Sequence, residues 1–170
     1  VAERAGLSRQ APYNHFADKE AMLAVLAAQG FERLAASVRA AAGWRAGVAA
    51  LAAAGEAYIA FAQARPALFR LMFARELVDM TRHPEAAAAA EDALAALSAV
   101  VAALCPAERV ADVSLAAWSI VHGYATLTNE AGIEPAERRA ARARQFAEII
   151  AASAATAADA ATRPIRERKA

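Results

Sequence analysis

At 170 residues, the chain is long enough to bury a substantial core. Its hydrophobic fraction of 59% is largely alanine, and charged residues interrupt every run of larger apolar side chains, so no window reaches the roughly 18 consecutive apolar residues of a membrane span. With 19 basic and 18 acidic residues, the net charge of +1 excludes nucleic-acid binding by bulk charge alone. Any contact with DNA must be local.

Cysteine and histidine usage limits the chemistry further. Cys105 is the single cysteine, which excludes an internal disulfide framework and favours a reducing, cytoplasmic compartment. The three histidines are far apart, without the spacing of a metal site. We therefore expect no metal and no other cofactor.

The first residues are typical of the end of a helix that stops at Ala5-Gly6. The chain begins without methionine, so we expect an N-terminal helix to precede Val1 in the natural protein. Ser8 offers an N-cap for a second, short helix that ends near Phe16. Two short helices joined by a glycine-containing turn form a helix-turn-helix arrangement.

The remaining elements are all predicted to be helical, because alanine favours helices and strand-like alternation is absent. Asp18 offers a cap for a helix that fades near Gly43, and a further helix from Trp44 stops at Arg65-Pro66. The later helices are predicted at 66–73, 84–105, 108–131 and 135–160, and residues 163–170 form a tail. The fold class is therefore all-α.

Residue types at the start of the second short helix fit DNA. Arg9 and Gln10 can pair in bidentate fashion with guanine and adenine edges, and the helix N-terminus presents free N–H groups. Tyr13, His15 and Lys19 supply donors of the kind that hold phosphates. The alternatives are ordinary solvated positions for Arg9 and Gln10 and a core position for Tyr13.

Two stretches resemble a known family. The run VAERAGLSRQAPYNHFADKEAML is similar to the helix-turn-helix of TetR/AcrR-type bacterial repressors, with its Ala-Gly turn, serine, Tyr-x-x-Phe and Lys-Glu. AYIAFAQARPALFRLMF and AWSIVHGYATL resemble the regulator subfamily with a WHG-type C-terminal domain, through Trp118, His122 and Gly123. Pro12 departs from the pattern, since many relatives carry an aliphatic residue there.

The resemblance implies a DNA-binding part in residues 1–42, truncated at its start, and a helical ligand-binding and dimerisation domain in residues 43–162. The last two long helices would pair with their copies in a homodimer that binds a palindromic double-stranded DNA operator. The residues implied to contact DNA are Ser8, Arg9, Gln10, Ala11, Tyr13, Asn14, His15 and Lys19.

Large apolar side chains between residues 58 and 73 and around Trp118 are candidates for an effector site. Because these side chains are nearly all hydrophobic, we expect a small, largely apolar effector with His122 as the polar contact. The alternative is that they form plain core and that His122 is a hydrogen-bonded core residue. The candidates are Tyr58, Phe61, Phe69, Met72, Phe73, Trp118 and His122.

The sequence therefore predicts a DNA-binding transcriptional regulator, a repressor released by its effector, and not an enzyme. An adaptor domain without DNA binding is the alternative. A helical-bundle enzyme fits less well, since nucleophile-elbow, dinucleotide-binding and phosphate-loop motifs and clustered carboxylates are absent from the sequence.

Overall fold

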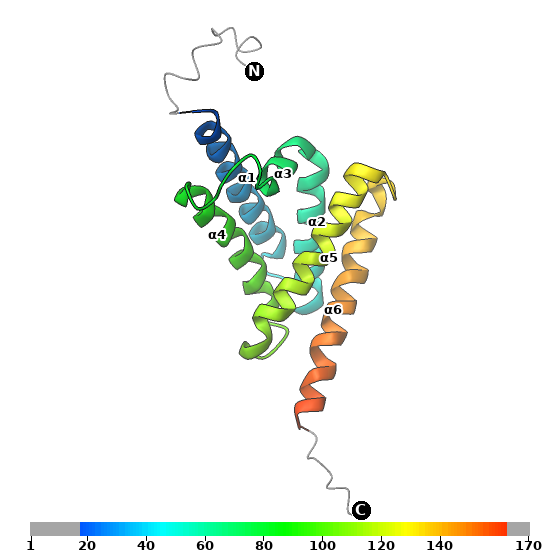
Figure 1. Ribbon diagram of the computed structural model, residues 1–170. Coiled ribbons are helices and arrows are strands. Elements are labelled where there is room, and N and C mark those ends of the chain that lie inside the picture. The colour runs from blue at the N-terminus through cyan, green and yellow to red at the C-terminus, as the bar shows by residue number, and fades with distance from the viewer. Residues whose placement is uncertain (1–17, 163–170) are drawn as a thin grey trace, which may run out of the picture.

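The structure is a computed structural model that describes residues 18–162, with side chains described through residue 154. Every regular element in the described range is helical, which confirms the all-α prediction (Figure 1). The α-helices are α1 (Lys19–Ala42), α2 (Gly47–Ala64), α3 (Pro66–Phe73), α4 (Pro84–Val101), α5 (Val110–Ala131) and α6 (Arg139–Thr162). Short 3-10 turns, η3 (Ala107–Arg109) and η4 (Ala136–Arg138), precede α5 and α6.

The helices α1, α3 and α4 begin where the sequence predicts them. The Asp18 carboxylate accepts a hydrogen bond from the Ala21 backbone N–H at 2.8 Å and caps α1. The predicted start of the second long helix at Trp44 is wrong, because α2 begins only at Gly47. Gly43 and Gly47 have φ of 46° and 58°, so the chain turns sharply between them and leaves Trp44 90% exposed.

The helices pack around α2, which contacts all five other α-helices. In Figure 1, α1 and α4 lie together on one side of the bundle, whereas α5 and α6 lie on the other. The buried residues of the main core cluster come from α1 to α5, including Phe31 of α1, Tyr58 of α2 and Val121 of α5, and Phe146 of α6 packs against them. The C-terminal end of α6 extends beyond the rest of the bundle.

Small residues decide which face of α1 is buried. Helical periodicity predicts an apolar stripe that includes Leu23, Leu26 and Leu34, but Leu26 is 42% exposed. The buried face instead follows Ala24, Ala27, Phe31 and Leu34, because alanine lets the neighbouring helices approach closely. Exposure of an isolated leucine is normal for a protein surface.

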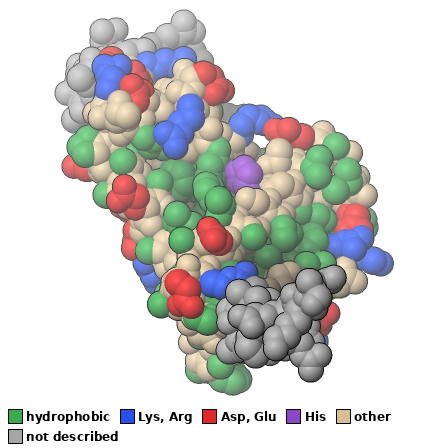
Figure 2. Space-filling model, turned by 60° about the horizontal axis from the view of Figure 1, so that its bottom comes forward, with side chains coloured by type: hydrophobic (Ala, Val, Ile, Leu, Met, Phe, Trp, Pro, Cys, Tyr) green, Lys and Arg blue, Asp and Glu red, His purple; other side chains and the backbone are tan. Residues whose placement is uncertain are grey.

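Both α1 and α2 are long and apolar enough to cross a membrane by length and composition, but 44% of each qualifying window is buried inside the bundle. Such burial is typical of core helices in a packed domain. Charged side chains of both signs are scattered over the face shown in Figure 2, with hydrophobic side chains between them.

Candidate functional site

An apolar cavity of about 230 Å³ lies at the centre of the bundle. All six α-helices contribute to its wall, as does the loop between α3 and α4. Its larger apolar lining residues are Phe31, Leu34, Leu51, Met72, Phe73, Met80, Leu97, Val121, Phe146 and Ile150. Tyr58, Trp118, Arg75 and Glu91 also line it, and the last two are exposed residues at its outer part.

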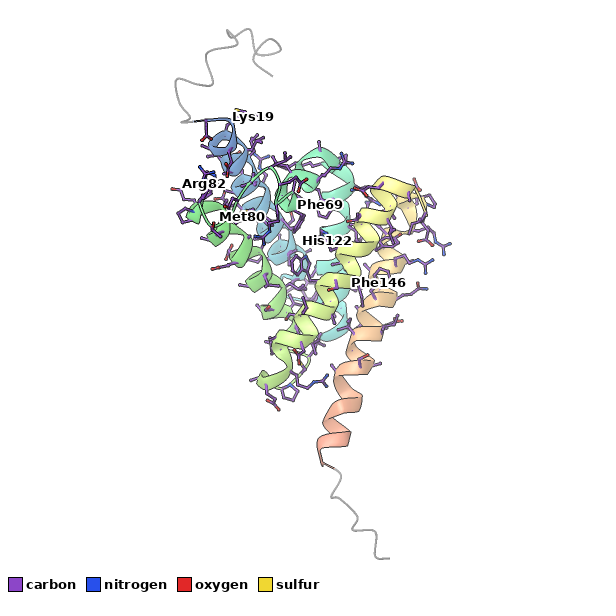
Figure 3. The ribbon with its side chains drawn as sticks, viewed as in Figure 1. Lys19, Phe69, Met80, Arg82, His122 and Phe146 are labelled. Carbon is purple, nitrogen blue, oxygen red and sulfur yellow. The ribbon has the colours of Figure 1, made fainter. Side chains whose placement is uncertain are left out.

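A chain reversal at Arg65-Pro66 places α3 over this cavity. Proline has no N–H to donate, so α2 ends at Ala64 and Pro66 begins α3 at a new angle. The short helix then buries Phe69 and Met72, while Phe73 is partly buried beside them. In Figure 3, Phe69 of α3 lies next to His122 of α5, and their ring centroids are 5.3 Å apart.

Two polar side chains of the cavity wall, Tyr58 and Trp118, form a hydrogen-bonded relay with His122. The Trp118 indole Nε1–H donates to the Tyr58 hydroxyl oxygen at 3.2 Å, and that oxygen lies 2.9 Å from Nδ1 of His122. Because the indole can only donate, the Tyr58 oxygen accepts from it and its own proton is available to Nδ1. The relay therefore uses both the indole N–H and the phenol O–H, and neither is free for a ligand in the cavity.

This relay and its burial favour a neutral imidazole. An Nδ1 that accepts from Tyr58 requires the single proton of neutral His122 to lie on Nε2. Burial lowers the pKa of His122, since desolvation disfavours the charged ring. Burial also raises the pKa of Tyr58, against a smaller lowering by the Trp118 hydrogen bond, so the phenol stays protonated.

A second cavity of about 210 Å³ lies between α3 and α5. Phe73 lines both cavities, and His122 lines only the second. Its lining contains more charged and polar side chains than that of the first cavity. Arg70, Glu76 and Glu130 lie around the aromatic residues of its wall. The second cavity is lined by Pro66, Phe69, Arg70, Phe73, Ala74, Glu76, His122, Thr126, Asn129 and Glu130.

The predicted effector residues divide between these two cavities. Tyr58, Met72, Phe73 and Trp118 line the first cavity, and Phe69, Phe73 and His122 line the second. Phe61 lines neither, since it is buried in the core beneath the Arg65 guanidinium, 5.6 Å from the ring centroid.

Sequence reasoning missed part of the wall of the first cavity. Phe31, Leu34 and Val38 follow one another at helical spacing on α1, and this pattern could have identified them. Phe146 could not be found this way, because α6 reaches the cavity through its packing on α2 and α5.

The loop between α3 and α4 connects the first cavity with the beginning of α1. Arg75 and Met80 of this loop line the cavity. Farther along, the Glu20 carboxylate in the first turn of α1 accepts from Arg82 Nη1 at 2.7 Å and lies 3.1 Å from His83 Nε2. The loop therefore contacts both the first cavity and the first turn of α1. Figure 3 shows Met80 and Arg82 on the same side of the molecule as Lys19.

Most of the predicted DNA contacts lie outside the described residues, namely Ser8, Arg9, Gln10, Ala11, Tyr13, Asn14 and His15. Lys19 is described and is exposed in the first turn of α1. Residues 18–162 contain no group of three or more His, Cys, Asp or Glu that could hold a metal ion.

Comparisons with known proteins agree with this helical architecture. The family described as "Tetracyclin repressor-like, C-terminal domain" matches residues 51–152, more than half of the chain. A solved structure described as that of a protein with unknown function from Rhodococcus sp. RHA1 is similar, with 26% identity and a TM-score of 0.72 over 91% of this chain and 82% of that one. No curated protein matches significantly. The match over residues 51–152, which carry most of the cavity wall, places this chain in the tetracyclin repressor-like (TetR) family.

Proposed function

We propose that this protein is a cytoplasmic, one-component transcriptional repressor whose helical domain binds a small apolar effector in the first cavity. Membership of the TetR family supports a regulator in general. The observation that carries the effector assignment is the apolar cavity of about 230 Å³ at the centre of the bundle. Trp118, His122 and Gly123 further support assignment to the WHG-type subfamily.

The size of the cavity limits the effector. An apolar cavity of about 150 Å³ in another protein binds benzene, so 230 Å³ suits a substituted single ring or a short branched alkane. Because the relay consumes the donors of Trp118 and Tyr58, a ligand hydroxyl group buried beside them, away from Arg75 and Glu91, would lose hydrogen bonds to water without full replacement. We therefore expect hydrocarbons to bind more tightly than phenols or alcohols of the same shape.

Effector release follows from linkage between two sites. A ligand that prefers one arrangement of the α3–α4 loop shifts α1 through the contacts of Glu20. By the resemblance, α1 follows directly on the DNA-binding residues. Coupling of this kind typically amounts to about 1–3 kcal/mol, which suffices to release an operator.

A homodimer formed through α5 and α6 completes the proposal. Leu115 and Leu127 of α5 and Ile149 of α6 are 57%, 52% and 56% exposed. A side chain added at Gly123 of α5 would meet no atom within 4 Å in the described residues, so the backbone is open to close approach there. A two-fold dimer of this kind fits a palindromic operator.

Toluene and phenol, titrated calorimetrically into the full chain, test the effector class. We expect toluene to bind and phenol to bind more weakly. Ala54→Leu fills the cavity, since Ala54 lines it and is 1% exposed, and should abolish toluene binding. The matched control is Ala88→Leu at an exposed position of α4 outside the lining, which should bind toluene normally. Binding that survives Ala54→Leu would refute the assignment.

DNA binding is tested on duplexes selected in vitro from a random pool. We expect affinity that falls steeply with salt, and relaxed base preference in Arg9→Ala and Gln10→Ala. Toluene should weaken the complex. Affinity that does not change with salt, together with no selected sequence, would instead favour the adaptor alternative.

A further inference from the structure

The second cavity has the features of a cation site. We propose that it binds a small organic ammonium ion, independently of the apolar effector. The proposal depends on three features of the described residues: an aromatic corner, an excess of carboxylates over cations, and the absence of a metal-binding group.

Three rings meet at the floor and wall of the cavity. The Phe73 centroid lies 4.4 Å from that of His122 at an interplanar angle of 72°, and 5.2 Å from that of Phe69 at 64°. The rings therefore pack edge against face as one aromatic cluster in the wall of this cavity. Aromatic rings attract organic cations through their quadrupoles, and a corner of several rings is the usual recognition element for quaternary ammonium groups.

The charges around the cavity favour a cation over an anion. Two carboxylates, Glu76 and Glu130, face one guanidinium, that of Arg70. Arg70 pairs with Glu130, with Nε 3.7 Å from Oε1, whereas Glu76 has no ion pair within residues 18–162. The lining thus has an excess of one negative charge, while His122 adds none because burial keeps its ring neutral.

An organic cation fits this lining better than a metal ion does. The described residues hold no cluster of three or more potential metal ligands. The wall combines apolar surface from Pro66 and Phe69 with polar groups at Thr126 and Asn129, which suits a ligand with alkyl groups around its charge. A cavity of about 210 Å³ accommodates a cation of the size of choline.

Choline and its neutral isostere 3,3-dimethylbutan-1-ol are the probes, since they share a shape and differ in charge. We expect choline to bind the full chain about tenfold more tightly than the isostere and to shift the His122 ring resonances in NMR spectra. Choline should still bind when the first cavity is saturated with toluene, so failure of the apolar-effector proposal would not affect this test. Equal affinity for the two probes, or no choline binding, would overturn the proposal.

Two substitutions with opposite expected effects sharpen the test. Glu76→Gln should weaken choline binding about two- to fivefold, and Arg70→Gln should strengthen it, because each removes one exposed charge from the rim. The control Glu137→Gln changes an exposed carboxylate of η4 outside the cavity and should leave binding unchanged. A site for anions would reverse the first two effects, and would refute the proposal.

Discussion

Tyr58 connects the walls of the two cavities, because it is hydrogen-bonded to Trp118, which lines the first, and to His122, which lines the second. Its hydroxyl group accepts from Trp118 Nε1–H and donates to Nδ1 of His122, while its ring packs edge-on against Phe69 at 5.8 Å between centroids. Tyr58 is 5% exposed, so a polar group that loses this hydroxyl as its partner is largely shielded from solvent. The loss of stability when this hydroxyl is removed therefore depends on its two former partners, the Trp118 N–H and His122 Nδ1.

We predict that Tyr58→Phe lowers the free energy of unfolding by about 1–3 kcal/mol, because the indole N–H and Nδ1 lose their partner. Urea denaturation measures the loss. In a His122→Phe background the same change should cost less, since one of the stranded groups is already absent. Strict additivity of the two substitutions would contradict the relay.

His122 is predicted to make stability depend on pH. Its pKa in the folded state is lowered by burial, so the unfolded chain binds the proton more readily. Stability from this group is complete above the ordinary histidine pKa of about 6.5 and is lost as the pH falls below that value toward the lowered folded pKa. Urea denaturation between pH 7.5 and pH 5 should therefore show a steeper loss for the wild type than for His122→Gln. A steeper loss in the variant would contradict this sign.

At the scale of the elements, α1 and α3 approach each other closely at a glycine, Gly30 of α1. A Cβ at Gly30 would lie 2.7 Å from Sδ and 2.8 Å from Cγ of Met72, closer than van der Waals contact allows. Met72 is 1% exposed but borders the first cavity, so its flexible side chain has space on that side.

We predict that Gly30→Ala changes stability by no more than about 1 kcal/mol, since the gain in helix propensity offsets the displacement of Met72. Toluene binding should weaken, because Met72 moves into the cavity. Calorimetry of thermal unfolding and of toluene binding tests this. The matched control is Gly123→Ala, where the added Cβ meets nothing within 4 Å, so toluene binding should not change. A large loss of stability with normal toluene binding would show that Met72 does not move into the cavity.

At the scale of the whole molecule, the proposed homodimer would cover the apolar residues exposed on α5 and α6. In a two-fold interface each residue acts twice, so one added charge places two like charges near each other. We predict that Ile149→Glu converts a dimer into monomers, as measured by sedimentation equilibrium. Leu77→Glu, at a residue 46% exposed in the α3–α4 loop, should leave the mass unchanged. A dimer that persists in both Ile149→Glu and Leu115→Glu would place the interface elsewhere.

The sequence by itself determined the helical class and most boundaries, because these depend on local chemistry. Asp18 caps α1 by accepting a hydrogen bond from the nearby backbone. Pro66 and Pro84 begin α3 and α4, because the first position of a helix does not need the N–H that proline lacks. The start of α2 escaped prediction because the backbone conformation of two glycines, not hydrophobic periodicity, sets it.

Only the tertiary structure decided which aromatic residues lie in the core and which line the two cavities. Phe61, Phe69 and Phe73 have the same chemistry, yet one lies in the core, one lines the second cavity, and one lines both. That division arises from the angle between α2, α3 and α5, and the pairing of Tyr58 with His122 spans 64 residues of sequence. Local preferences carry no information on contacts at that separation, so the cavities and their relay follow from packing alone.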